Sequence, residues 1–267
     1  MSDVILTEVD SATHVATLTL NKPDKFNAFD RELVDRWAQA LRELGADREV
    51  HAIVVTGAGK AFCAGGDLAT LGEEAVPLQR KEFLRDHVHP VMRALRDVPQ
   101  PVIAMVNGAA MGAGLDMALL CDLRIAADEA KLGEAYVNLA LVPGDGGAWL
   151  LPRLVGPARA LELLWTGKVL TGAEAADWGL VNQSVPREEL AATTYALAEK
   201  LAAGPQLAQR IIKRAVYSAE TMPRETHYDM ISSYMAMAQS HEDFLGAVEA
   251  AQKGDRPTFT SGDPRPR

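Results

Sequence analysis

The chain has 267 residues, of which 48% are hydrophobic and 24% charged, as expected for a globular protein with one full hydrophobic core. Its net charge of −9, without a cluster of lysine or arginine, argues against nucleic acid as the main ligand, because binding phosphates needs clustered basic charge. No apolar run reaches the roughly 18 to 20 residues of a membrane span, and the start MSDVILTEVD lacks the pattern of a secretory signal. We therefore expect a cytoplasmic protein in which Cys63 and Cys121 are buried free thiols.

Short strand-like runs alternate with helical patterns from residue 14 to about 185. The run HVATLTL alternates as a half-buried strand does, whereas AIVVTG and PVIAMVNG are continuously apolar and fit strands buried on both faces. After the first run, Asp30 is expected to cap a helix over RELVDRWAQALREL, whose apolar residues make one stripe. This alternation predicts an α/β fold.

The pattern changes after Pro186, where the strand-like runs stop. No period of 20 to 50 residues is visible, so the sequence does not indicate a repeat protein. We divide the chain into a core over residues 1–190 and a helical region with a tail over residues 191–267. Helical patterns cover residues 188–203, 205–219 and 223–239, and a fourth begins at SHED, where Ser240 and Asp243 have capping-box spacing.

A glycine- and alanine-rich stretch, NGAAMGAGLDMALLCD at 107–122, follows an apolar strand-like run. A strand that leads through glycines into a helix presents free N–H groups to negative charge. The Rossmann pattern does not fit, because Met117 stands at its third glycine position, and a P-loop would need Gly-Lys-Ser/Thr. The alternative is that the small residues only let the helix pack tightly.

A second stretch, TGAGKAFCAGGDLATL at 56–71, also leaves a strand-like run through glycines and offers an unhindered N–H at Gly66, with Asp67 behind it. Two such turns are able to converge on one oxygen atom. Two N–H donors directed at a thioester carbonyl would stabilise the enolate that forms when the adjacent carbon loses a proton. This favours stabilisation of an enolate over a purely structural use of the glycines.

In these two glycine-rich stretches the chain resembles the crotonase superfamily of enoyl-CoA hydratases and isomerases. The resemblance implies a core spiral of repeated ββα turns, a C-terminal helical region used in trimerisation, and often a dimer of trimers. It also implies an acyl-CoA ligand, no metal and no redox cofactor, with coenzyme A entering as part of the substrate. Five blocks carry it in order: NKPDKFNAF at 21–29, GAGKAFCAGGDL at 57–68, VNGAAMGAGLDMALLCDLRIA at 106–126, LVPGDGGAWLLPRLVG at 141–156 and TGAEAADWGLVNQSVP at 171–186.

The resemblance assigns binding roles to matching positions. The oxyanion donors would be the N–H groups of Gly66 and Ala113, which would contact the thioester. Lys253 and Phe259 match places that reach a neighbour's CoA in relatives, although an exposed lysine is ordinary at a surface. The backbone around Lys25, Phe26, Ala64, Gly66, Asp67 and Leu68 would line the CoA groove.

The acid and base residues depart from the hydratase pattern. Hydratases of this family place one glutamate where this chain has Asp116, shorter by roughly 1.5 Å, and a second where it has Tyr136. Glu134 is not expected to replace the second, because two positions along a helix turn a side chain about 200° away. Asp145 lies one residue beyond the place of a single catalytic acid in some isomerases, and is either a catalyst or a helix cap. Asp116 is either catalytic or a buried structural carboxylate.

These residues predict an enzyme that hydrates a 2- or 3-enoyl-CoA or migrates its double bond. The alternatives are a specialised hydrolase, decarboxylase or ring-opening enzyme on the same scaffold, and an acyl-CoA-binding member without activity. Residues 72–95 are expected to build the acyl pocket. His87 and His89 lack a third ligand at metal spacing, and we expect no metal site.

Overall fold

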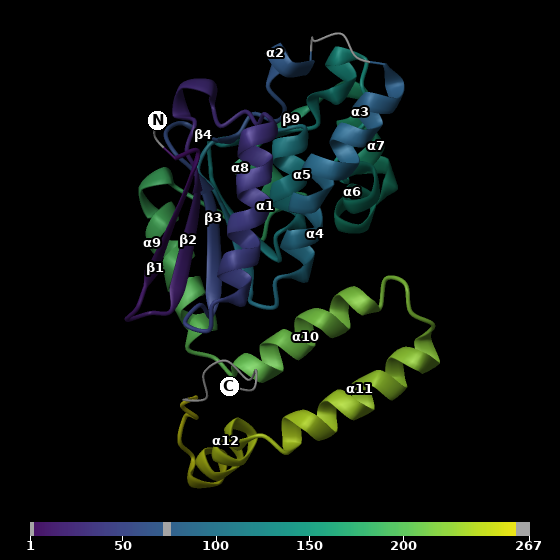
Figure 1. Cartoon of the computed structure of the whole chain (residues 1–267). Coiled ribbons are helices and arrows are strands. Elements are labelled where there is room, and N and C mark those ends of the chain that lie inside the picture. Colours follow the sequence, from purple (N-terminus) through teal and green to yellow (C-terminus); the bar gives the residue numbers. More distant parts are fainter. Residues whose placement is uncertain (1–2, 72–75, 260–267) are drawn as a thin grey trace.

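The computed structural model describes residues 3–71 and 76–259, which form two sheets and surrounding helices (Figure 1). The larger sheet has the order β1-β2-β3-β5-β7-β10 and the smaller β4-β6-β8-β9. The strands are β1 (Ile5–Asp10), β2 (Val15–Leu20), β3 (Ala52–Gly57), β4 (Ala61–Cys63), β5 (Val102–Val106), β6 (Ala109–Met111), β7 (Leu123–Ala127), β8 (Lys131–Gly133), β9 (Val169–Thr171) and β10 (Gln183–Val185).

The helices lie between and after these strands. The α-helices are α1 (Arg31–Ala46), α2 (Leu68–Leu71), α3 (Pro77–Phe83), α4 (His89–Asp97), α5 (Ala113–Leu120), α6 (Gly147–Val155), α7 (Pro157–Thr166), α8 (Gly172–Asp177), α9 (Arg187–Ala202), α10 (Gln206–Ser218), α11 (Arg224–Gln239) and α12 (Glu242–Lys253). Three further helical turns are η1 (Pro23–Lys25), η2 (Leu84–Val88) and η3 (Ala135–Leu139).

Successive turns of the chain each add one strand to each sheet. The pairs β3 and β4, β5 and β6, and β7 and β8 all follow this rule, and the first member joins the larger sheet while the second joins the smaller. Neighbouring strands from successive turns are parallel in both sheets, and one or more helices follow each pair. This is the expected ββα spiral, and it places the connections after β4 and β6 side by side.

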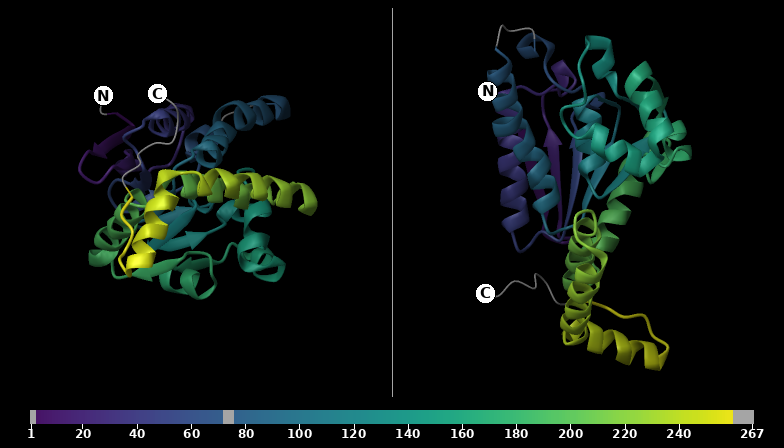
Figure 2. Two further views of the ribbon diagram at one scale, coloured as in Figure 1. Left: turned by 90° about the horizontal axis from the view of Figure 1, so that it is seen from below. Right: turned by 90° about the vertical axis from the view of Figure 1, so that its right-hand side faces the viewer.

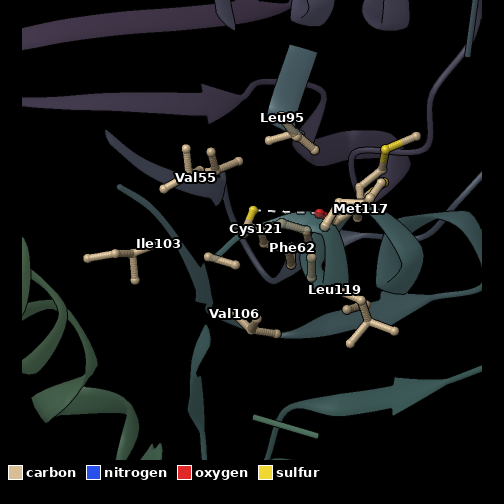
Figure 3. Packing of buried hydrophobic residues seen from close by; sticks show 14 of the residues in the cluster. Val55, Phe62, Leu95, Ile103, Val106, Met117, Leu119 and Cys121 are labelled. Carbon is tan, nitrogen blue, oxygen red and sulfur yellow. Dashed lines mark hydrogen bonds between the residues drawn. The ribbon is translucent and has the colours of Figure 1, made fainter. Parts of the chain in front are cut away.

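Continuously apolar runs form the central strands, as expected. Every residue of β3 is buried, and β5 is buried apart from Met105. α9 covers one side of the larger sheet, and α1 and α4 lie on the other side (Figures 1 and 2). Figure 3 shows side chains from β3, β4, β5, α4 and α5 meeting in this core, with the Cys121 thiol 3.5 Å from the carbonyl of Met117. Cys63 and Cys121 are both free and buried.

Two helix starts test the expected caps. The Asp30 carboxylate accepts a hydrogen bond from the backbone N–H of Leu33 at 3.1 Å, which confirms it as the cap of α1. Ser240 does not cap α12, because it ends α11 and its hydroxyl donates to the carbonyl of Ala236 at 2.8 Å. The cap of α12 is the next residue, His241.

The last three helices extend beyond the end of the larger sheet (Figures 1 and 2). α9 packs on β2, β3, β5 and β7, so a boundary at residue 190 falls inside a helix that belongs to the core by its contacts. We therefore propose that the helical region begins after α9, near Gly204. Over residues 3–71 and 76–259, no helix is long and apolar enough to cross a membrane.

Candidate active site

The two glycine-rich turns meet where β4 and β6 end. A Cβ atom added to Gly65 would lie 2.8 Å from the carbonyl oxygen of Met111 and 3.6 Å from the backbone nitrogen of Ala113. Gly65 itself has a φ of +89°, which an L-residue rarely adopts. The end of the first turn therefore lies against the start of α5, as the sequence predicted.

Several of the small residues are needed for packing. A Cβ atom on Gly114 would lie 2.1 Å from the carbonyl oxygen of Cys63, and one on Gly108 would lie 2.0 Å from that of Lys60. Both contacts are far below van der Waals distance and involve backbone atoms that have little freedom to move. Tight packing, one of the two interpretations of this stretch, thus holds for these two glycines.

The N–H groups of Gly66 and Ala113 are left available by the local backbone. Phe29 donates its N–H to the Gly65 carbonyl at 2.8 Å and accepts from the N–H of Asp67 at 2.9 Å. In such a parallel bridge the N–H of the intervening residue, Gly66, points away from the partner strand. Ala113 is the first residue of α5, where N–H groups have no partner within the helix. Over the described residues, neither N–H donates to another backbone group.

A strained turn brings residues 22–29 against the first glycine-rich stretch. Phe26 and Asn27 both have positive φ, of 52° and 57°. Asn27 is fully buried, and its side-chain N–H groups donate to the carbonyls of Ala58 at 3.0 Å and Ala61 at 2.8 Å. Asparagine tolerates this backbone conformation better than most residues. Sequence analysis did not single out Asn27, although an asparagine inside a turn-forming block was the available signal.

The residues expected to line a CoA groove lie together on this surface. The Lys25 ammonium is 2.7 Å from a carboxylate oxygen of Asp67, and the N–H of Ala64 donates to the carbonyl of Phe26 at 3.0 Å. The apolar side chains of Phe26 and Leu68 are 55% and 65% exposed. The surface therefore combines a cation with exposed apolar side chains near the available N–H groups.

Tyr136 joins the two aspartates that sequence analysis identified. Its hydroxyl oxygen is 2.7 Å from Oδ2 of Asp116 and 2.9 Å from Oδ2 of Asp145. Asp116 lies in the first turn of α5, three residues after Ala113, and is fully buried. Asp145 precedes α6 and is 4% exposed. The fold therefore gathers all three groups at the start of α5.

Glu134 belongs to the same cluster, contrary to the expectation from helical spacing. A Cβ atom on Gly147 would lie 2.4 Å from Oδ1 of Asp116 and 3.3 Å from Oε2 of Glu134, so the two carboxyl groups flank the same glycine. Glu134 is not helical, because it follows β8 and precedes η3 with φ −95° and ψ 76°. Glu134 is fully buried. Glu134 is therefore the third buried acid of the site.

Asp145 does not cap α6. The capping position is Gly146, which has no side-chain cap, whereas the Asp145 carboxyl contacts Tyr136. Because it caps no helix, the Asp145 carboxyl is a buried group that makes its hydrogen bond with another residue of the site, Tyr136. A buried acid costs free energy unless it is paired or neutral.

Burial favours the protonated form of each acid in this cluster. It raises the pKa of Asp116 to about 7, although the hydrogen bond from Tyr136 works in the opposite direction. Burial and the negative charge of Asp116 raise the pKa of Glu134 well above its usual range. Burial also raises the pKa of Asp145, again against the Tyr136 hydrogen bond, and that of the Tyr136 phenol. Burial thus shifts all four groups towards their neutral forms, and Asp116 titrates near neutral pH.

The remaining candidates lie elsewhere or have ordinary surroundings. His87 and His89 contact different partners, since His87 Nδ1 is 2.8 Å from Asp35 and His89 Nε2 is 3.1 Å from the Gly144 carbonyl. Burial raises the pKa of the Cys63 thiol to about 12, which makes it a poor nucleophile near neutral pH. Lys253 pairs with Glu249 of its own helix at 2.5 Å. Of the expected acyl pocket at 72–95, residues 72–75 lie outside the described part of the chain.

Comparisons with known proteins agree with this architecture. The sequence model of the enoyl-CoA hydratase/isomerase family matches residues 10–260. The chain is 37% identical to a 1,2-epoxyphenylacetyl-CoA isomerase of Escherichia coli K12, over 97% of this chain and 99% of the relative. It is 38% identical to a crotonyl-CoA hydratase of Syntrophomonas wolfei, over 75% of this chain and 77% of the relative.

A solved structure of enoyl-CoA hydratase from Bacillus anthracis superposes with a TM-score of 0.89 at 33% identity, covering 96% of this chain and 98% of that one. The match therefore extends over sequence and fold together. The chain belongs to the enoyl-CoA hydratase/isomerase family, within the crotonase superfamily.

Proposed function

We propose that the chain acts on a 2- or 3-enoyl-CoA and migrates its double bond at least as readily as it hydrates it. Membership of the family makes it an enzyme of the enoyl-CoA hydratase/isomerase type. The relatives from Escherichia coli and Syntrophomonas wolfei are named as an isomerase and a hydratase, both of CoA thioesters. Their names support the substrate class, and the choice between isomerisation and hydration rests on the geometry of the site. The observation that carries the choice is Tyr136, which stands between two aspartates where hydratases of the family place a second glutamate.

The two available N–H groups would form the oxyanion hole. Removing a proton next to the thioester sends the electron pair of the broken C–H bond to the carbonyl oxygen, which becomes an enolate. Donors at Gly66 and Ala113 would stabilise that charge, and each such donor typically contributes about 10²- to 10³-fold to the rate. Ala113 also stands at the positive end of the α5 dipole, which favours the same charge.

The surface beside these donors would bind the CoA portion. Lys25 offers positive charge to phosphate, while Phe26 and Leu68 offer apolar contact. The backbone of Ala64 and the carboxylate of Asp67 hold this surface in shape through their contacts with Phe26 and Lys25. Coenzyme A enters as part of the substrate, and no other cofactor is part of the proposal.

An aspartate would move the proton. A pKa of about 7 allows Asp116 to accept a proton and to release it again near neutral pH, as an efficient general base should. Isomerisation needs a proton taken from one carbon and returned two carbons away, while the oxyanion hole holds the dienolate. Hydration needs in addition a group that activates water, and a tyrosine between two acids is poorly suited to this.

The other functions considered have less support. A non-catalytic acyl-CoA-binding protein would have no use for three buried acids, which are costly to keep in a folded protein. Hydrolysis, decarboxylation or ring opening would use the same oxyanion hole on a different acyl group. A panel of acyl-CoAs that vary in chain length, branching and double-bond position distinguishes these reactions directly.

The test compares a 3-enoyl-CoA with a 2-enoyl-CoA of the same length. We expect the 3-enoyl substrate to be isomerised with a kcat/KM at least equal to that for hydration of the 2-enoyl substrate. Asp116→Asn should lower isomerisation by about 10²- to 10⁴-fold, as expected for loss of a general base. Asp145→Asn gives the same comparison for the second acid. Efficient hydration that survives both substitutions would overturn the proposal.

A further inference from the structure

Tyr136 has one hydroxyl proton and two carboxyl neighbours. Its oxygen is 2.7 Å from Oδ2 of Asp116 and 2.9 Å from Oδ2 of Asp145, and both distances are those of hydrogen bonds. A phenol donates only one hydrogen bond. The second contact is favourable only if that aspartate is protonated and donates to the phenol oxygen. The geometry therefore requires one neutral and one ionised aspartate, or two neutral ones.

We infer that Tyr136 is a proton relay that connects Asp116 and Asp145, so that the proton taken from the substrate by one aspartate is not the proton returned by the other. This inference rests on the proposed isomerisation and names the group that links its two acids. Tyr136 acts through the aspartates and is a positioning residue in this scheme.

The relay conserves protons and charge. In one state Asp145 is neutral and donates to the Tyr136 oxygen, while Tyr136 donates to ionised Asp116. In the other state the proton of Asp145 has moved to the phenol oxygen and the phenol proton has moved to Asp116. Two O–H bonds break and two form, Tyr136 stays neutral, and the negative charge passes from Asp116 to Asp145.

The surroundings allow the two states to lie close in free energy. Asp116 and Asp145 are both almost completely buried. Asp116 also accepts a hydrogen bond from the backbone N–H of Gly147, and protonated Glu134 hydrogen-bonds to it from the other side. At the Asp145 end His89 favours the ionised form of the carboxyl group, and at the Asp116 end the N–H of Gly147 does so. Over the described residues, neither aspartate pairs with a lysine or arginine that would fix the charge on it.

In a turnover, the ionised aspartate removes a proton from one carbon of the enoyl chain. Both aspartates are then neutral, and the second gives its proton to the other carbon as the dienolate collapses. The charge now lies on the second aspartate. Transfer of two protons through Tyr136 restores the starting state without solvent, which suits a buried site.

Tyr136→Phe removes the relay and keeps the ring that packs against Gly112. We expect kcat for isomerisation to fall about 10²-fold with little change in KM, within the range for loss of a proton-transfer group. The acid limb of the pH profile should move to higher pH, because the Tyr136 hydrogen bond favours the ionised form of both aspartates. Tyr195→Phe is the matched control, since it removes a hydroxyl that contacts Thr17 at 2.8 Å elsewhere in the fold.

Pre-steady-state kinetics distinguish the relay from a structural role. The first turnover needs no relay, because one aspartate starts ionised and the other neutral, whereas every later turnover needs the two protons to be moved back first. Tyr136→Phe should therefore complete its first turnover at close to the wild-type rate and then slow about 10²-fold, while the wild-type enzyme shows no such burst. An unchanged kcat and pH profile and no burst in Tyr136→Phe would overturn the relay.

An infrared measurement tests the shared proton without substrate. In a Glu134→Gln background at pH 7, a protonated-carboxyl band should remain, move in Asp145→Asn and change in Tyr136→Phe. Absence of that band at pH 7 would overturn the relay whatever the enzyme does. If the band behaves as expected while no enoyl-CoA is isomerised, the relay geometry stands and the proposed reaction is wrong.

Discussion

The N–H of Gly66 is the residue-scale feature on which the oxyanion hole depends. Gly66→Pro removes that N–H, while Gly66→Ala keeps it and adds only a methyl group. We expect the proline variant to lose at least 10²-fold in kcat and the alanine variant to lose much less. Circular dichroism and sedimentation check that both remain folded and assembled. Full activity in a folded Gly66→Pro protein would show that Gly66 is not an oxyanion donor.

The raised pKa of Glu134 predicts how the free energy of unfolding should depend on pH. Its pKa is raised in the folded protein, so the folded state holds a proton that the unfolded state releases above its ordinary pKa near 4.5. Stability is therefore lost as the pH rises from about 4.5 towards the folded pKa, by up to about 1.4 kcal/mol for each pH unit. Glu134→Gln removes this loss.

Urea unfolding measures the effect. Wild type and Glu134→Gln should have similar free energies of unfolding at pH 4.5 to 5, and the variant should become progressively more stable towards pH 8. Glu129→Gln is a control, because that exposed carboxylate forms a surface pair with Arg187 and has a lowered pKa. A constant difference between wild type and Glu134→Gln at all pH values would contradict the buried, protonated state of Glu134.

Sequence analysis identified part of this site and missed part for a physical reason. Asp116 and Asp145 lie in blocks that carry the family resemblance, Tyr136 was placed by counting seven residues back from Pro143, and the structure brings the three together. Glu134 was set aside because helical periodicity was applied to a residue that precedes the helical turn. Asn27 was missed because its role depends on carbonyls more than thirty residues away, which sequence spacing does not reveal.

At the scale of elements, the close packing of α5 on β4 explains why α5 has a glycine at position 114. Gly114→Ala would put a methyl carbon 2.1 Å from the Cys63 carbonyl, so helix and strand would have to separate. Overpacking of this kind typically costs about 1 to 3 kcal/mol, occasionally more. Gly246→Ala in α12 is the control, because its Cβ meets nothing within 4 Å and alanine favours helix by about 1 kcal/mol.

Thermal unfolding measures this pair of variants. We expect a lower Tm for Gly114→Ala and an equal or higher Tm for Gly246→Ala. Activity of Gly114→Ala should fall as well, because α5 carries both Ala113 and Asp116. An unchanged Tm for Gly114→Ala would mean that α5 shifts without cost, and the close approach would then not explain the glycine.

The strands and helices were predictable to different degrees. The strands β3 and β5 follow continuous apolar runs, the helices α1 and α9 to α12 follow helical patterns, and the existence of all of them was predicted correctly. β1 was missed because only Ile5 of its six residues is buried, so its sequence lacks a clear apolar face. The ββα repeat leaves no sequence period because the turns differ in length: β3 begins at Ala52, β5 at Val102 and β7 at Leu123.

At the scale of the whole molecule, the C-terminal helices α10 to α12 leave apolar side chains exposed when the chain is alone. None of the residues of α11 or α12, all of which the structure describes, is buried. α10 is tied to the core by Lys213 and Tyr217, which contact the two carboxylate oxygens of Asp122 at 2.7 Å each. A cavity of about 860 Å³ separates α10 and α11 from α4. Large apolar side chains are exposed here: Ile212, Val216, Tyr228, Met235, Met237, Phe244, Leu245 and Val248.

We predict that these helices mediate assembly into a trimer or a dimer of trimers, as the family resemblance implies. Exposed apolar surface of this extent marks an interaction site, and a closed symmetric assembly would cover it on every subunit. Leu245→Lys places a charge on the face that Phe244 and Val248 share, and should shift the protein towards single chains. Gly246→Lys places the same charge about 100° further around α12 and should leave the assembly intact.

Sedimentation velocity at micromolar concentration measures both variants beside the wild type. The wild type should sediment as three or six chains, Gly246→Lys likewise, and Leu245→Lys as smaller species with reduced thermal stability, because subunits that lose their partners also lose the free energy of association. A wild-type protein that sediments only as a single chain would contradict the prediction. If the wild type assembles and Leu245→Lys assembles equally well, the subunit contact lies on another surface, and the exposed face of α12 requires a different explanation.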